Sequence, residues 1–186
     1  MNNKEIRGLE FRAVENEDNK MIVEGYAVMF ESPATHDWTE IIDRHAFDVC
    51  DMSDVCLKYN HSDTNPILAR TRNHSLQLTV DDIGLKIRAE LIDTTSNRDM
   101  YKMVQEGLLD KMSFAFTVAG DEWDYDTNTR RITNIDKLYD VAIVDVPYYD
   151  TTEVHARMLK EFNSEKEKYQ ALKLAKVKAK AKLSLN

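Results

Sequence analysis

The sequence has 186 residues, of which 42% are hydrophobic and 31% charged, and its formal net charge at pH 7 is −8. This length and composition are typical of one globular domain with an appendage. No apolar run reaches the length of a membrane span and the first residues lack the apolar stretch of a signal peptide, so we expect a cytoplasmic protein without a membrane partner. Two cysteines, Cys50 and Cys56, are too few for a disulfide framework or a zinc site, and we expect two free thiols.

The charge is divided unevenly along the chain. From residue 159 onward eight lysines face three glutamates, which gives +5, so the first 158 residues carry −13. We therefore expect an acidic body, residues 1–158, and a basic helical tail, residues 159–186, with too few large apolar residues to form a core of its own. The lysines of this tail either contact an acidic partner or are simply solvated.

Short alternating apolar segments separated by turn clusters predict a strand-rich body. In chain order, strands are expected within residues 9–15, 21–30, 54–61, 67–72, 75–80, 84–91 and 107–118, then in a hairpin over 120–135 and in a last strand over 137–147 that Pro147 ends. Residues 40–50 are expected to form a loop with a short helix, and residues 81–84 a hairpin turn.

Two helices are predicted. Residues 94–107 begin with Ser96 as N-cap and Asp99 three residues later, and Gly107 supplies the C-terminal stop. Residues 153–182 form one long helix rich in alanine and lysine. Together with the strands, this predicts an α+β domain: a mostly antiparallel, closed or nearly closed β-barrel with peripheral helices and a C-terminal helix.

The strand expected over 107–118 has two unlike faces. Met112, Phe114 and Phe116 share one face, whereas Ser113 and Ala115 lie on the other, which is narrow. Such a face is typical either of tight packing against a neighbouring strand or of a nucleophilic serine that needs room for a substrate. A serine nucleophile requires a base within hydrogen-bond reach and a group that orients the base.

His61, at the end of the strand over 54–61, is the candidate base, because a neutral imidazole accepts a proton near pH 7. Candidates for the orienting group are Asp140, Asp145 and His155, and the residues alone do not choose among them. Asp140 lies in an apolar strand, where an acid is paired or functional.

Cofactor and metal sites have little support. The remaining histidines, His36, His45 and His74, have no spacing typical of a metal cluster. The chain also lacks a glycine-rich phosphate loop, so we expect no cofactor.

Six motifs in order resemble the prohead (capsid-maturation) serine proteases of tailed bacteriophages, which are distant relatives of the herpesvirus assemblin proteases. The motifs, spread over roughly residues 8–157, are VEGYAVMFES, TEIIDRHAF, LKYNHSDTNPILART, LTVDDIGLKIRAELIDT, VQEGLLDKMSFAFTV and KLYDVAIVDVPYYDTTEV. The resemblance implies a herpesvirus-protease-like fold and a serine endopeptidase, with His61 as base, Ser113 as nucleophile and Asp140 as the acid. The chain departs from the family in having aspartate where glutamate is usual, and Ala142 where serine is common.

The resemblance also implies partners and a place of action. Its expected substrates are the major capsid protein, or a scaffold segment, and the protease itself, inside the assembling prohead in the host bacterial cytoplasm. Self-association is possible, and neither a specific nucleic acid nor a membrane is expected as a partner. The alternative is a capsid assembly or scaffolding protein that retains the fold without activity.

Overall fold

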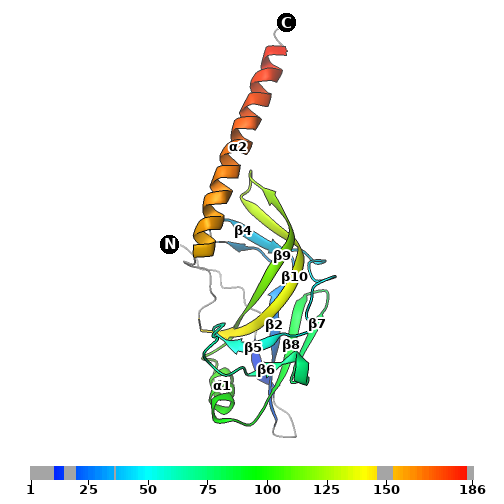
Figure 1. Ribbon diagram of the computed structural model, residues 1–186, viewed down its shortest axis with the longest axis vertical. Coiled ribbons are helices and arrows are strands. Elements are labelled where there is room, and N and C mark those ends of the chain that lie inside the picture. Colours follow the sequence, from blue (N-terminus) through cyan, green and yellow to red (C-terminus); the bar gives the residue numbers. More distant parts are fainter. Residues whose placement is uncertain (1–10, 15–19, 36, 146–152, 184–186) are drawn as a thin grey trace.

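The computed structural model describes residues 11–14, 20–35, 37–145 and 153–183; in the last helix, side chains are described from residue 159 to 181. The described strands lie in two sheets (Figure 1). The four-stranded sheet has the order β1 (Arg12–Val14), β2 (Met21–Met29), β8 (Gly84–Leu91) and β7 (Leu76–Val80), and all its pairings are antiparallel.

The second sheet is built around β10 (Thr129–Val144), a strand of 16 residues. β9 (Lys111–Asp124) pairs antiparallel with it over its whole length, with several register shifts. On its other edge β10 pairs in parallel first with β4 (Thr39–Ile42) and then with β5 (Cys56–Tyr59). The short strands β3 (Ala34–Thr35) and β6 (Ala69–Arg70) complete the edges beside β4 and β5.

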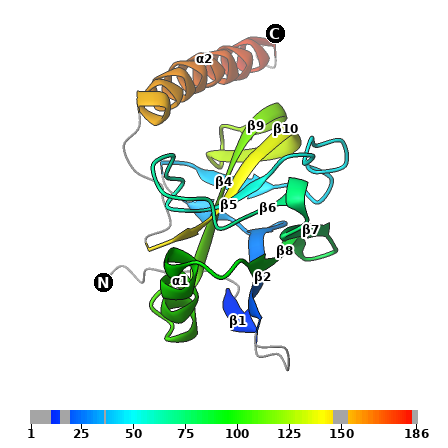
Figure 2. The same ribbon diagram turned by 60° about the horizontal axis from the view of Figure 1, so that its bottom comes forward.

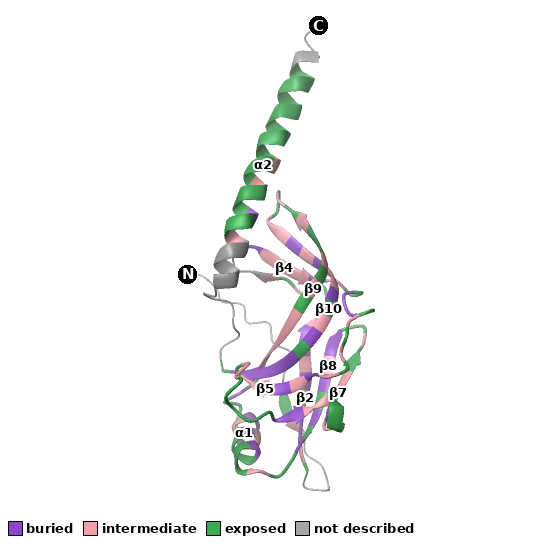
Figure 3. Ribbon diagram, viewed as in Figure 1, coloured by how far each residue is buried: buried purple, intermediate pink, exposed green. Residues whose placement is uncertain are grey.

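One hydrophobic core lies between these sheets. Its fully buried members come from both of them, and the most buried large side chains include Val23, Leu57, Ile87, Leu138 and Val141. Figure 3 shows the buried residues concentrated along β2, β5, β8 and β10, where the sheets face each other. The predicted α+β class with mostly antiparallel pairing is confirmed, but a closed ring of strands is not present among the described pairings.

Helix α1 (Thr95–Gln105) packs at one end of the sheets, beside β1 and β2 (Figure 2). Its N-cap is Thr94, whose side chain accepts a hydrogen bond from the Asn97 backbone N–H at 3.2 Å, so the prediction of Ser96 as N-cap is wrong. The helix is capped two residues earlier because Thr94 has the extended backbone that a cap requires. Gly107 follows the helix with φ of +69°, which confirms it as the stop.

Two other predicted elements differ. Residues 40–42 of the loop expected over 40–50 belong to β4, because the first residues of β10 offer an edge to pair with, and turns rather than a helix follow. The hairpin arm and the last predicted strand are one element, β10, whose bulges carry it through the polar residues between them. Pro147 lies outside the described residues.

Helix α2 (Glu153–Leu183) leaves the sheets at the end opposite α1 and projects away from them (Figure 1). It runs through the boundary predicted at residue 159. Phe162 is only 6% exposed and packs on Trp38, Trp123 and Tyr125, so the first part of the predicted tail is docked on the body. From residue 170 to 181 the side chains are exposed (Figure 3). Within the described chain, no helix is long and apolar enough to cross a bilayer.

Candidate active site

His61 lies in a tight turn that follows β5. Asn60 and His61 have φ of +50° and +52°, and the Ser62 N–H donates to the Tyr59 carbonyl at 3.0 Å, as in a type I′ turn. Left-handed backbone costs a residue other than glycine roughly 1–2 kcal/mol. Two further contacts hold the turn against this strain: the Asn60 N–H donates to the Ile143 carbonyl at 2.9 Å, and the Asp145 N–H donates to Asn60 Oδ1 at 3.2 Å.

This turn places the imidazole on Asp140 of β10. His61 Nδ1 lies 2.6 Å from Asp140 Oδ1, and Nδ1–H donates to the carboxylate. The Asp140 side chain is 8% exposed and that of His61 is 26% exposed. A carboxylate so deeply buried needs partners, and the structure supplies the imidazole on one oxygen and Lys58 Nζ at 3.5 Å from the other.

Ser113 lies on β9, directly across from Ala142 of β10. Asp140 is two residues from Ala142 along the same strand, so Ser113 and Asp140 are diagonal neighbours on one face of the sheet. Diagonal neighbours of this kind have main chains about 7–8 Å apart. Among the described residues, Ser113 Oγ makes no hydrogen bond, and the contact of His61 is through Nδ1.

The two faces of β9 divide as predicted. Met112 and Phe114 pair with Ile143 and Val141, and both pack against the core. On the opposite face Ser113 pairs with Ala142, which is fully buried and has the smallest side chain after glycine. A larger residue at position 142 would stand between Ser113 on one neighbouring strand and Lys58 on the other.

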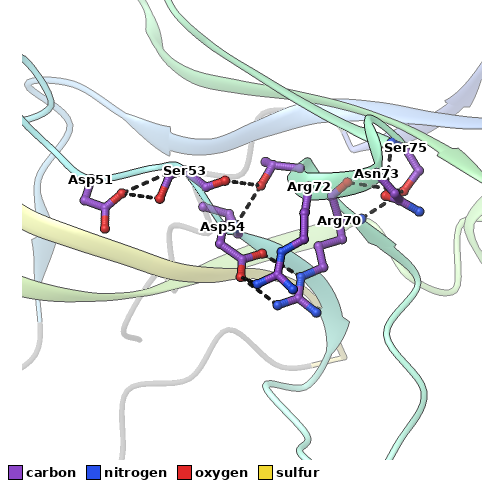
Figure 4. A network of polar contacts seen from close by, with 9 residues as sticks. Asp51, Ser53, Asp54, Arg70, Arg72, Asn73 and Ser75 are labelled. Carbon is purple, nitrogen blue, oxygen red and sulfur yellow. Dashed lines mark hydrogen bonds and ion pairs between the residues drawn. The ribbon is translucent and has the colours of Figure 1, made fainter.

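A network of hydrogen bonds and ion pairs joins β6 to the segment before β5, the strand that carries Lys58 and leads to the His61 turn (Figure 4). Arg70 of β6 donates to both oxygens of Asp54 at 2.6 and 2.7 Å, and Arg72 also contacts Asp54. These arginines hold the pKa of Asp54 down, to about 2. Asp51 accepts hydrogen bonds from the backbone and side chain of Ser53 at 3.0 and 2.6 Å, which fixes the approach to β5.

The other predicted candidates are not gathered here. Asp145 contributes its backbone to the His61 turn, His45 pairs at the surface with Asp48 at 3.1 Å, and His74 ends a 3₁₀ turn, η1 (Thr71–Asn73). The side chain of His155 and all of His36 lie outside the described residues.

Metal-ligating and thiol side chains are spread over the described residues. In the described ranges, no group of three or more histidine, cysteine, aspartate or glutamate side chains is placed to hold a metal. Cys50 and Cys56 are both free thiols, as predicted.

Two residues of the site were missed by the sequence reasoning. The sequence signal for Asn60 is its residue type, because asparagine is favoured where φ is positive. Lys58 is three residues before His61 and alternates with buried Leu57, which was a signal that it lies on the polar face of β5.

The family model of the caudovirus prohead serine proteases matches the chain over residues 7–167. The chain belongs to this family. The match includes both sheets, the His61 turn and Phe162, and it ends before the projecting part of α2. Searches of curated proteins and of solved structures gave no significant match. The expected kinship with phage prohead proteases is thus confirmed.

Proposed function

We propose that this prohead protease is the serine endopeptidase of capsid maturation, with Ser113 as nucleophile, His61 as general base and Asp140 as the acid that orients it. The observation that carries the proposal is the 2.6 Å contact between His61 Nδ1 and Asp140, with Ser113 diagonal to that aspartate on the next strand. One imidazole ring, with a hydrogen bond at each nitrogen, spans such a diagonal separation.

The chemistry follows from these positions. The Nε2 atom of His61 takes the proton of Ser113 while Oγ attacks the scissile carbonyl carbon, and the oxyanion that forms needs backbone N–H donors. His61 then gives the proton to the leaving amine as the C–N bond breaks and the acyl-enzyme forms. In the second half His61 takes a proton from water, which attacks the acyl carbon, and returns it to Ser113 Oγ as the ester bond breaks. Asp140 holds the proton on Nδ1 and stabilises the imidazolium.

The substrates in this proposal are a scaffold protein or the scaffold-like part of the major capsid protein, and the protease itself, inside the prohead in the host cytoplasm. The family supports capsid proteins as substrates. The close approach of β2 to β9 supports a nearly closed barrel, which we retain as part of the proposal. The acidic body and the basic tail remain proposed as separate functional parts.

The experiment is co-expression of the wild-type chain with the capsid protein, followed by mass spectrometry of the capsid protein. We expect one defined cleavage with wild type and none with Ser113→Ala. The matched control is Thr117→Ala, which removes a hydroxyl four residues along the same strand, where Oγ1 donates to Asp136. Cleavage that continues unchanged with a folded Ser113→Ala variant would overturn the role of Ser113. The absence of cleavage with the wild-type chain would support the alternative, an assembly protein without protease activity of its own.

A further inference from the structure

Lys58 stands between two carboxylates of very different exposure. Its Nζ lies 2.6 Å from Asp63 Oδ1, whose side chain is 89% exposed, and 3.5 Å from Oδ2 of Asp140, which is 8% exposed. The other oxygen of Asp140 accepts from His61. The ammonium and the imidazole therefore share one buried carboxylate, while the surface carboxylate holds the ammonium at the shorter distance.

This arrangement couples Lys58 to the proton affinity of the imidazole. The positive charge of Lys58 opposes the negative charge with which Asp140 stabilises an imidazolium. Asp63 holds Lys58 at the shorter distance and so weakens that opposition. We propose that Lys58 is a positioning residue that sets the pH range in which His61 acts as base, with Asp63 limiting its effect; this rests on the proposed function.

Other charged groups on the same face of the sheet are held by partners of their own. Arg70 lies across Cys56 from Asp140 and is bound to Asp54, and Lys111, two residues before Ser113 on β9, pairs with Asp110 at 2.8 Å. Among the described residues, two side chains lie within ion-pair distance of Asp140: the imidazole of His61, which is charged only when protonated, and Lys58.

Lys58 is suited to be a fixed charge and not a base. The hydrogen bond to Asp63 raises the pKa of Lys58, and the charge of Asp140 raises it further, against the opposing effect of burial. The same hydrogen bond lowers the pKa of Asp63. Both groups therefore stay ionised through the range in which an imidazole titrates, and the pair changes the site by charge and position alone.

The test is the pH profile of kcat/KM for a peptide that spans the junction cleaved in co-expression. Lys58→Met should move the acid limb up by about one pH unit, because imidazolium is then stabilised without opposition. Asp63→Asn should move it down by about half a unit, because Lys58 approaches Asp140 more closely and a nearby negative charge is lost. Lys58→Arg, which keeps the charge, should restore most of the wild-type profile.

The double variant Lys58→Met with Asp63→Asn tests whether Asp63 affects His61 through Lys58. Asp63→Asn should shift the profile much less when Lys58 is already methionine. NMR titration of the His61 imidazole in a Ser113→Ala background, assigned by loss of the signal in His61→Gln, should show the same shifts of midpoint without relying on turnover.

The failures of the two proposals are distinguishable. Cleavage that depends on Ser113, with superimposable profiles and midpoints in all variants, would overturn the role of Lys58 and leave the protease standing. Since Asp63 is at the surface, Asp63→Asn remains informative even if Lys58→Met does not fold. Shifts of the same sign in Lys58→Met and Asp63→Asn would also overturn the inference. Absence of any cleavage that depends on Ser113 would overturn the proposed function itself.

Discussion

Phe162 is the residue whose removal should detach α2 from the body. Its ring centroid lies 4.9 Å from that of Trp123, 5.8 Å from that of Trp38 and 5.9 Å from that of Tyr125. Farther along the helix, Tyr169 and Lys173 both bind Asp126, at 3.0 and 2.7 Å, and the Tyr169 ring lies 5.6 Å from that of Tyr125. Lys173 and Asp126 are exposed, and Tyr169 is half-buried. Exposed pairs of this kind contribute little.

The size of the effect follows from these contacts. Burying a phenylalanine side chain is worth about 1.5–3 kcal/mol, and a well-placed aromatic pair, such as that with Trp123, adds about 0.5–1.5 kcal/mol. Phe162→Ala leaves no sealed cavity, because the helix can move away, so the loss is limited to the docking energy. We expect α2 docking to weaken by about 2–4 kcal/mol, which is more than tenfold in the docking equilibrium.

Tryptophan fluorescence measures this directly, because the chain has two tryptophans and both contact Phe162. Phe162→Ala should shift their emission to longer wavelength and lower the urea midpoint followed by fluorescence. The matched control is Leu172→Ala on the same helix, whose side chain is 56% exposed and whose emission should match wild type. Identical spectra and midpoints for Phe162→Ala and wild type would refute the reasoning.

Three further predictions concern the site and the sheets. Asp140→Asn should keep the fold by circular dichroism but lower kcat/KM by about 10⁴-fold, because the imidazolium loses its counter-charge; a loss below tenfold would speak against this role. The pKa of Asp54 is lowered to about 2, chiefly by its hydrogen bonds to Arg70, so its stabilisation is present above about pH 4 and disappears as pH falls through 2. Asp54→Asn should therefore unfold at lower urea than wild type at pH 7 and at the same urea near pH 2, and equal midpoints at pH 7 would contradict the ion pair. Gly84→Ala should lower the melting temperature, since a Cβ there would lie 1.9 Å from the Val28 carbonyl oxygen; an unchanged value would show that β2 and β8 separate easily.

Much of the fold was predictable because local patterns decided it. The hairpin of β7 and β8, the pairing of β1 with β2 and helix α1 follow from alternation, turn residues and the glycine stop, and all of them are local in sequence. The core face of β9 was predictable for the same reason: Phe114 and its neighbours on that face alternate with small residues.

The remainder depends on contacts between residues distant in sequence. β10 pairs in parallel with β4 and β5, and a local sequence pattern does not predict a parallel pairing between strands that are far apart in the sequence. In the sequence, Phe162 is an isolated aromatic residue in a largely polar segment, and its packing on Trp38 and Trp123 depends on the tertiary structure. Lys58 could be placed on a polar face, but its contact with Asp140 required the register of β5 on β10.

The proposed function requires that the Ser113 hydroxyl is an activated nucleophile, and covalent labelling measures this property. The wild-type chain would be treated at pH 8 with a fluorophosphonate, which phosphorylates an activated serine, and the adduct would be located by peptide mass mapping. We predict one adduct, on Ser113, that is absent in His61→Gln, because the hydroxyl then has no base to take its proton. An adduct on another serine, or labelling of Ser113 that is undiminished without His61, would show that Ser113 is not a nucleophile activated by His61.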